Sequence, residues 1–348
     1  MRKRTVSLLS FLLICSLLVA CAPAVPEITP QTQQYYEYFD TVSVVYSYAG
    51  DEESEFLSNC EAVEDVISYY HKLFDIYYEY SGVENLRTVN THAGISPVRV
   101  SEELIAFLEY CKEIYALTGG ETNFMIGAVT RLWHECREDA LDNPENARIP
   151  TESELSAAAE HISPDLLVID REAGTVYITD PEASIDVGAI GKGYAAERAS
   201  EVLEDLGAVG YVLNLGGNIV TIGTKPSGDG WRTSIRSPHS AGEYALTVTL
   251  SDISCVTSGN YERYYTVDGV RYHHIVDADT LMPSEHFASV TVLSDDSALA
   301  DALSTALFCM PYEQGRALVD GIAGTEAFWI DNAGVQQMTD GFLARITK

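Results

Sequence analysis

Helical and strand-like hydrophobic periodicities alternate along this chain, and the alternation limits its possible folds more than any other feature. Apolar residues recur at helical spacing over 55–70, 101–117 and 193–206, whereas 42–48 has the pattern of a strand. A hairpin is predicted over 166–179, where a turn signal separates two short strand patterns. The order lacks the regular strand–helix–strand rhythm of a parallel sheet, so we predict an α+β or mixed α/β fold.

The start of the chain has the pattern of a lipoprotein export signal. Basic residues at 2–4 precede an apolar run over 6–20, which is too short for a comfortable membrane span. The run ends at Leu18-Val19-Ala20-Cys21, the spacing of a lipobox, at which a peptidase cuts before a cysteine that carries lipid. We predict a lipidated Cys21 at the mature N-terminus. An ordinary cleaved signal with an incidental cysteine is the alternative.

The remaining sequence divides into a short tether and one large folded domain. Segment 21–35 is rich in Pro, Gln and Thr and has little apolar surface to bury, which is typical of a flexible linker. We therefore predict a signal peptide over 1–20, the tether over 21–35 and the folded domain over 36–348. A domain of that length can be one large unit or two closely joined lobes.

Composition excludes several classes of function. The chain has 21 Lys and Arg against 52 Asp and Glu, a net charge of −31, so binding to nucleic acid is not expected, and an anionic ligand needs a local cation. Five cysteines outside the signal and lipobox are scattered without a C-x-x-C pair, so neither a zinc site nor a dense disulfide framework is predicted. A single disulfide among them remains open.

The Gly-rich segment Asp186–Glu197 leads directly into the helix predicted over 193–206. It departs from the P-loop pattern, because Asp186 replaces the first glycine and Gly193 replaces the Ser or Thr. Main-chain N–H groups at a helix N-terminus attract anions, and Lys192 adds a full positive charge. The segment fits a diphosphate site. A tight turn with Lys192 in solvent is the alternative, and the segment alone does not decide between them.

A helix predicted over 296–308 carries a potential pair of metal ligands. Asp301 and Thr305 are one helical turn apart and so share a face. Carboxylate and hydroxyl oxygens suit Mg²⁺, which needs only one or two protein ligands when it also binds phosphate oxygens. The structural alternative places Asp301 in solvent and bonds the Thr305 hydroxyl to a helix carbonyl.

Two adjacent histidines, His273 and His274, lie on a short extended run. Neighbouring residues of a strand point to opposite faces, so only one of them can serve a given site. An imidazole is well suited to take a proton from a hydroxyl near neutral pH. A buried histidine held by hydrogen bonds is the alternative, and spacing does not choose between the two functions.

Together and in this order, the motifs resemble those of the FAD:protein FMN transferase family, the ApbE-type flavin transferases. The matching segments are FDT at 39–41, Tyr77, Asn90, LTGGETNFMIGAVTRLW at 117–133, DVGAIGKGYAAE at 186–197, NLGGNI at 214–219, DGW at 229–231, TSGNYER at 257–263, HHIVDADT at 273–280 and ADALSTALF at 300–308. The resemblance implies the fold of that family, with two closely packed lobes and the flavin site between them.

The resemblance also implies a reaction. FMN passes from FAD, the substrate, to a Thr or Ser hydroxyl of an acceptor protein, and AMP leaves. It places the cofactor Mg²⁺ on Asp301, Thr305 and the main-chain carbonyl of Ala189. His274, Asp301 and Lys192 would be catalytic, with Lys192 offsetting charge on the diphosphate and His274 acting on the incoming hydroxyl. The acceptor would be an exported flavoprotein, either a redox-complex subunit or an extracellular reductase. The enzyme would be anchored by Cys21 to the outer face of the cytoplasmic membrane.

Some positions that would bind FAD differ from the family pattern. The positions that correspond to FAD contacts are Phe39, Tyr77, Asn90, Glu121, Thr122, Asn123, Asp186, Lys192, Glu197, Ser258, Gly259, His274 and Ile275. Phe39-Asp40 replaces the usual Met-Gly, Glu121-Thr122-Asn123 replaces Ala-Phe-Asp, and Glu197 replaces Asp. Asn123 would therefore contact FAD through an amide.

Two other functions remain open. One is Mg²⁺-dependent hydrolysis of FAD to FMN and AMP with water as the acceptor, and Asn90 is at a position linked to that balance in the family. The other is a lipid-anchored flavin-binding protein without catalysis. Both Asp301 and Lys192 are present, which favours an enzyme.

Overall fold

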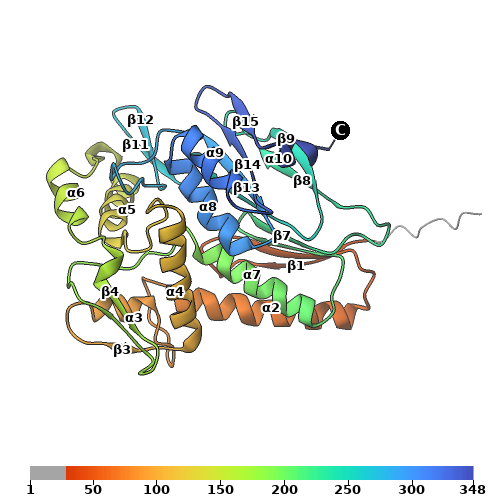
Figure 1. Ribbon diagram of the computed structural model, residues 1–348, viewed down its shortest axis with the longest axis horizontal. Helices are drawn as coiled ribbons and strands as arrows, with labels where there is room; N and C mark the ends of the chain where they lie inside the picture. Colours follow the sequence, from red (N-terminus) through yellow and green to blue (C-terminus); the bar gives the residue numbers. More distant parts are fainter. Residues whose placement is uncertain (1–28, 348) are drawn as a thin grey trace, which may run out of the picture.

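The computed structural model describes residues 29–347 and contains an eight-stranded sheet in which every pairing is antiparallel (Figure 1). In order across the sheet, the strands are β1 (Gln31–Tyr35), β2 (Ser43–Ser47), β6 (Tyr211–Leu215), β7 (Asn218–Ile222), β10 (Ser254–Gly259), β13 (Ser289–Ser294), β14 (Glu326–Ile330) and β15 (Gln336–Met338). β7 and β10 pair only at Ser254 and Cys255, so the two strands diverge at the end of β10 that bears Ser258 and Gly259. This divergence opens the middle of the sheet.

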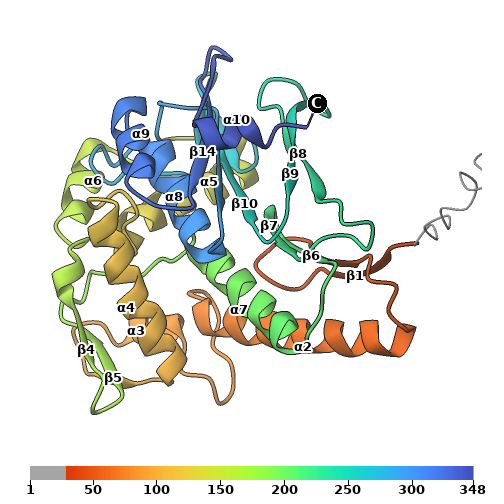
Figure 2. The same cartoon turned by 45° about the vertical axis from the view of Figure 1, so that its right-hand side comes forward.

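Three helices form a layer against the sheet: α2 (Glu53–Phe74), α7 (Gly191–Asp205) and α8 (Ser297–Cys309). α7 lies between the other two, and α8 packs on β10 and β13 (Figures 1 and 2). Two short helices, α9 (Tyr312–Asp320) and α10 (Asp340–Ala344), pack on β14. The middle of this layer therefore brings the start of α7 close to α8.

A second lobe lies beside the sheet. Its helices are α3 (Leu86–Thr91), α4 (Glu102–Leu117), α5 (Gly127–Asp142) and α6 (Glu152–Ala159), with the short 3-10 turns η1 (Pro144–Asn146) and η2 (Pro164–Leu166). Its strands form the sheet β3 (Val98–Arg99), β5 (Thr175–Ile178), β4 (Leu167–Asp170) and the hairpin β11 (Tyr264–Val267) and β12 (Val270–His273). A separate hairpin, β8 (Trp231–Arg236) and β9 (Tyr244–Leu250), stands next to the main sheet (Figure 2).

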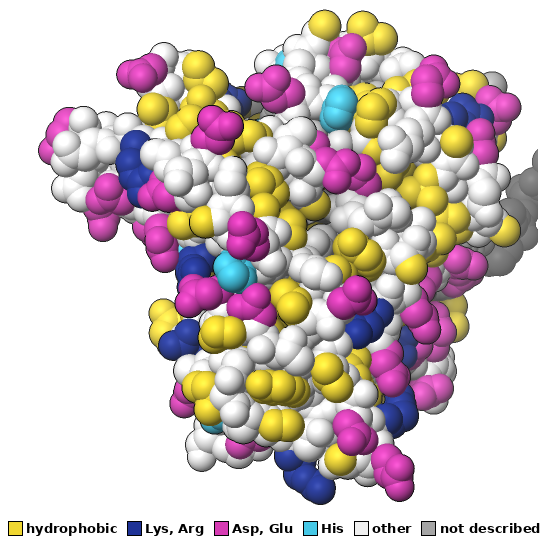
Figure 3. Space-filling model, turned by 60° about the vertical axis from the view of Figure 1, so that its left-hand side comes forward, with side chains coloured by type: hydrophobic (Ala, Val, Ile, Leu, Met, Phe, Trp, Pro, Cys, Tyr) yellow, Lys and Arg dark blue, Asp and Glu magenta, His cyan; other side chains and the backbone are white. Residues whose placement is uncertain are grey.

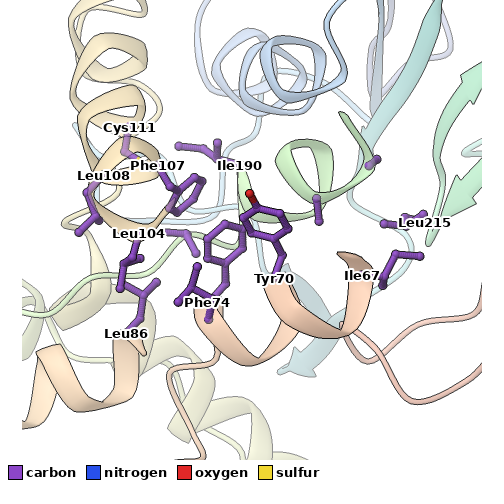
Figure 4. Packing of buried hydrophobic residues seen from close by; sticks show 14 of the residues in the cluster. Ile67, Tyr70, Phe74, Leu86, Leu104, Phe107, Leu108, Cys111, Ile190 and Leu215 are labelled. Atoms are coloured by element: carbon purple, nitrogen blue, oxygen red, sulfur yellow. The ribbon is translucent and has the colours of Figure 1, made fainter. Parts of the chain in front are cut away.

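A continuous hydrophobic core joins the lobes. Phe74 of α2 and Phe107 of α4 stack with ring centroids 3.9 Å apart, and Ile190 at the start of α7 lies near them (Figure 4). Burying such aromatic rings removes a large apolar area from water and so ties the lobes into one unit. The predicted mixed α and β fold with two closely packed lobes is confirmed.

The predicted elements form where local signals specified them. The Oγ of Ser101 accepts a hydrogen bond from the Leu104 N–H and caps α4. β4 and β5 pair antiparallel across the predicted turn. Gly207 follows α7 with a φ of +75°, the left-handed conformation that ends helices.

The structure corrects the predicted boundary of the tether. Gln31–Tyr35 is not linker: it forms the edge strand β1, paired with β2 along its whole length. The Tyr35 hydroxyl donates to the Cys60 carbonyl over 2.8 Å. The predicted signal peptide, Cys21 and the first part of the tether lie outside the described residues.

No helix between residues 29 and 347 is both long and apolar enough to cross a membrane. The structure has no disulfide among the five cysteines of the described residues. All five are buried and unpaired: Cys60, Cys111, Cys136, Cys255 and Cys309.

Candidate active site

The Gly-rich segment does form a turn into a helix, and its glycines allow α7 and α8 to approach closely. α7 begins at Gly191, two residues before the predicted start. A Cβ on Gly193 would lie 2.3 Å from the Asp301 Cβ and 2.4 Å from the Ser297 carbonyl oxygen. No side chain fits at this position, so glycine is needed for the contact between the helices.

Asp301 is held at this contact. The residue lines the cavity between the lobes but is only 4% exposed, and its Oδ2 accepts the Gly193 N–H over 2.7 Å. The Lys192 Nζ lies 4.0 Å from the same oxygen. Burial raises the pKa of Asp301, while Lys192 and the Gly193 N–H oppose that shift. A nearby cation would stabilise the charged carboxylate.

Thr305 lies one turn further along α8 and also lines the cavity. Its hydroxyl is 3.4 Å from the Ser258 Oγ, which in turn lies 2.8 Å from the Ser304 Oγ. Ala189, in the turn before α7, lines the same cavity. Asp301, Thr305 and Ala189, which are predicted to hold Mg²⁺, therefore line the same cavity.

These ligands suit a hard cation that also binds oxygens of the enzyme's substrate. Within residues 29–347, no group of three or more His, Cys, Asp or Glu side chains has the arrangement of a metal site. A cation at Asp301 would therefore depend on one carboxylate, neutral oxygens and the oxygens of a ligand. That donor set suits Mg²⁺ bound to a phosphate compound better than Zn²⁺ or a structural Ca²⁺.

The structure separates the two histidines. His273 is 7% exposed, and its ring nitrogens contact the Ser284 carbonyl over 2.9 Å and the Ile275 N–H over 3.2 Å. The ring of His274 is exposed towards the cavity, and its Nδ1 lies 3.2 Å from the Arg263 carbonyl. A carbonyl only accepts hydrogen bonds, so Nδ1 carries the proton and Nε2 keeps a lone pair.

His274 is neutral at pH 7. Desolvation within the cavity lowers its pKa to about 3, and the positive groups Arg263 and Lys192 act in the same direction. An uncharged imidazole with a free Nε2 can accept a proton. An arriving diphosphate would offset the surrounding positive charge and raise this pKa, which makes the ring a stronger base when substrate is bound.

Several predicted flavin contacts hold the walls of the cavity. The Asn90 amide forms two hydrogen bonds with the main chain of Ile185, at 2.8 and 2.9 Å. Asp186 accepts the Gly188 N–H over 2.9 Å and the Thr130 hydroxyl over 2.7 Å, which shapes the turn before α7. Their side chains line the cavity, and their polar atoms already have partners.

Thr122 and Asn123 act in the same way. The Thr122 hydroxyl donates to the Ala302 carbonyl over 2.8 Å. The Asn123 amide donates to the Ile162 carbonyl over 3.0 Å, and its oxygen accepts the Met125 N–H over 2.8 Å. Both side chains line the cavity while their polar groups are bonded to the protein.

Glu121 and Glu197 differ in their position. Glu121 lines the cavity; burial together with Asp277 and Asp279 raises its pKa to about 7. Glu197 is not among the residues that line the cavity. Its Oε2 instead accepts the Ser297 N–H over 2.7 Å at the start of α8, and burial raises its pKa to about 7.

Aromatic side chains also line the cavity. Tyr77 is 55% exposed, with its ring centroid 5.4 Å from that of His134, so its face is available for stacking. Phe39 and Asp40 have φ angles of 55° and 50°, which explains why glycine suits the second position in the family. Phe39 packs edge-on against His71, with centroids 5.5 Å apart. Ser258, Gly259 and Ile275 also line the cavity.

Arg263 is a site residue that was not predicted from the sequence. Its carbonyl orients His274, and its Nη2 lies 3.4 Å from the Asp40 carbonyl. The signal was present, because Arg263 ends the motif TSGNYER and directly precedes the strand that pairs with His273. Acidic side chains are spread over the face shown in Figure 3, with Lys and Arg side chains among them.

Comparison with known proteins identifies the family. A model of the ApbE family matches residues 39–329. An FAD:protein FMN transferase of Treponema pallidum (strain Nichols) is 33% identical over 267 residues, which cover 70% of this chain and 70% of the relative. One of Klebsiella pneumoniae (strain 342) is 30% identical over 231 residues, which cover 66% of this chain and 69% of the relative.

Solved structures agree in fold. The crystal structure of the ApbE protein of Thermotoga maritima has a TM-score of 0.80 at 26% identity and covers 92% of this chain and 100% of its own. The flavin transferase ApbE from Vibrio cholerae has a TM-score of 0.73 at 23% identity, with coverage of 91% and 100%, and supports the fold alone. The family match runs from just before β2 into β14 and includes both lobes, so this chain belongs to the ApbE family.

Proposed function

We propose that this chain is an FAD:protein FMN transferase that moves FMN from FAD to a Thr or Ser hydroxyl of an exported flavoprotein and releases AMP. The observation that carries the proposal is the convergence of Asp301, Lys192 and His274 on one cavity, although they come from separate segments of the chain. Relatives that match most of the chain have the name FAD:protein FMN transferase.

The reaction is a displacement at phosphorus. The acceptor hydroxyl oxygen forms a bond to the phosphorus of the FMN half of FAD, and the bond from that phosphorus to the bridging oxygen breaks. AMP leaves with the bridging oxygen, and the hydroxyl proton passes to His274 Nε2. The products are AMP and an FMN phosphoester of the acceptor.

The chain's own groups position the diphosphate. The N-terminus of α7 presents its partial positive charge, and Lys192 adds a full charge beside Asp301. Asp301, Thr305 and the Ala189 carbonyl would hold Mg²⁺, which when bound neutralises charge on the phosphate oxygens. The Arg263 carbonyl keeps the proton on His274 Nδ1 and leaves Nε2 for the hydroxyl.

We further propose that the protein works outside the cytoplasmic membrane. The lipobox at Leu18–Cys21 supports lipidation of Cys21, and a tether up to about β1 would separate the domain from the membrane. An enzyme placed there meets exported acceptors, such as a subunit of a membrane redox complex or an extracellular reductase.

One experiment separates transfer from the other candidate functions. The protein is incubated with FAD, Mg²⁺ and a Thr-bearing exported flavoprotein, and the products are analysed by mass. Transfer gives acceptor heavier by one FMN and an equal amount of AMP. Free FMN and AMP with unmodified acceptor would instead assign FAD hydrolysis, and unchanged FAD would assign binding without catalysis.

A further inference from the structure

One strand at the cavity has an edge without a partner. β8 pairs with β9 and with no other strand among the described residues. All six residues of β8 line the cavity, whereas Tyr244 is the single residue of β9 that does so. The free edge of β8 therefore borders the space between the lobes.

Hydrogen bonds at the edge of β9 that faces away from β8 show which main-chain groups of β9 point to β8 and which point to the C-terminal segment. The Thr249 N–H donates to the Arg345 carbonyl, and the Thr247 carbonyl accepts the Thr347 N–H, both over 2.8 Å. The N–H and C=O of one residue in an antiparallel strand point to the same edge. Thr247 and Thr249 thus face the C-terminal segment, and Val248 between them faces β8.

This alternation fixes the free groups of β8. Thr233 is the partner of Val248, so its main-chain groups face β9. Its neighbours Arg232 and Ser234 then direct their N–H and C=O groups outward, to the cavity. No hydrogen bond within residues 29–347 uses these outward groups. An added antiparallel strand forms its hydrogen bonds with alternate residues of an edge strand, and Arg232 and Ser234 have this spacing.

The size of the cavity allows a second occupant. Its volume is about 1830 Å³, which exceeds the roughly 300–1,000 Å³ of an ordinary small-molecule site. A flavin dinucleotide beside α7 leaves space along β8 for a segment of another chain.

The side chains of β8 indicate the chemistry of that segment. Arg232 and Arg236 are exposed on the same face of the strand, and Tyr244 lies opposite Arg236 in the hairpin. Arg236 is bonded to Glu262 over 3.1 Å, and Arg232 has no ionic partner in the described chain. In a protein with a net charge of −31, such an edge attracts an acidic segment.

We propose that the acceptor protein docks as an extended, acidic segment that adds a strand to the free edge of β8 and so carries its hydroxyl into the cavity. This rests on the proposed transferase function and names how its protein substrate is recognised. Main-chain pairing gives affinity that tolerates different acceptor sequences, and Arg232 selects acidic residues.

The test compares Ser234→Pro with Ser234→Ala in the full-length protein. Proline removes the outward N–H and blocks pairing at the edge, and an edge strand tolerates it because this N–H does not bond to β9. Alanine keeps the N–H, and both variants lose the 2.9 Å contact between the Ser234 and Thr247 hydroxyls. The probe is the exported acceptor that the wild-type protein flavinylates.

We expect Ser234→Pro to raise the KM for the acceptor by about ten-fold relative to Ser234→Ala, with the dissociation constant of FAD and the melting temperature matching between the two. Arg232→Glu, which keeps the main chain intact, should raise the same KM and should do so less at high salt. It also provides a second variant if the proline variant does not fold.

Other results would overturn the proposal. Equal KM values for the two Ser234 variants, with no effect of Arg232→Glu, would exclude docking on β8. A matching loss of FAD affinity in Ser234→Pro would assign the edge to the flavin, and a wild-type dimer disrupted by this variant would assign it to a second copy. If the wild-type protein modifies no acceptor, the transferase function fails first and this inference with it.

Discussion

The main-chain N–H of Gly193 donates to the Oδ2 of Asp301 over 2.7 Å, so the first turn of α7 directly orients a carboxylate of α8. The contact exists because Gly193 has no Cβ, and the close approach of the helices leaves Asp301 almost completely buried. The same glycine that allows the helices to pack therefore positions the carboxylate at the edge of the cavity.

Gly193→Ala is expected to impair both stability and activity. The added methyl group would overlap Asp301 and the Ser297 carbonyl, and overpacking of this kind costs about 1–3 kcal/mol of the free energy of unfolding. Gly321→Ala is the control, because its Cβ would meet nothing closer than 3.3 Å and its φ is ordinary. Denaturant unfolding of the two variants measures the difference. Equal stability would contradict the close contact.

Asp301→Asn should abolish metal-dependent turnover while the fold persists. The amide cannot supply the negative oxygen of a Mg²⁺ ligand, and loss of such electrostatic stabilisation typically lowers turnover about 100-fold or more. AMP release measured as a function of Mg²⁺ concentration tests this. Thr305→Ser keeps a hydroxyl at its position and should retain most activity. An unchanged Mg²⁺ dependence in Asp301→Asn would remove Asp301 from the metal site.

Local signals predicted much of the fold. The helices expected over 101–117 and 193–206 and the hairpin over 166–179 form, because the Ser101 cap, the β4–β5 turn and the stop at Gly207 depend on residues close together in sequence. β1 was missed because its sequence QTQQY has no hydrophobic alternation, and it forms a strand because β2 offers a partner edge. That pairing is tertiary, so composition alone indicated linker.

The sequence predicted which residues line the site better than it predicted the role of each residue. Asp301, Thr305 and His274 converge on the cavity as the motif order implied. Motif matching, however, does not tell a residue that faces a ligand from one that supports its neighbours. Glu197 shows this, since its carboxylate accepts an N–H at the start of α8 outside the cavity. Its role depends on packing between helices that are distant in sequence.

Glu197 is expected to make stability depend on pH. Burial raises its pKa from 4.5 to about 7, so the folded protein binds this proton more tightly than the unfolded chain. The contribution is present below pH 4.5 and is lost as the pH rises to about 7. Glu197→Gln keeps an oxygen for the Ser297 N–H and should be more stable than wild type at pH 8 by about 1–2 kcal/mol. Unfolding at pH 4 and pH 8 measures this. A wild-type advantage at pH 8 would contradict it.

Cys21→Ser is expected to release the protein from the membrane. Without the cysteine, the lipobox Leu18–Cys21 cannot be lipidated, and the described domain has no helix able to span a membrane. Fractionation of a bacterial host that expresses each form gives the answer, with FAD binding as the control for folding. Retention of Cys21→Ser in washed membranes would mean that another feature anchors the chain.

His274→Gln is expected to lower the rate of transfer, whereas His273→Gln is expected to lower the stability of the protein. His274 is open to the cavity and neutral, so its loss removes a proton acceptor and should slow transfer by about 100-fold or more at saturating FAD. The dissociation constant of FAD should change little. His273 is buried between the Ser284 carbonyl and the Ile275 N–H, so its replacement should lower the melting temperature instead. Because the pKa of His274 in the free protein is far below 6.5, any step in kcat/KM for FAD between pH 5.5 and 7.5 should come from another group, such as Glu121, and should persist in His274→Gln. A step that disappears in His274→Gln would contradict the lowered pKa of His274, and a defect of this variant confined to FAD affinity would show that His274 does not act as the base.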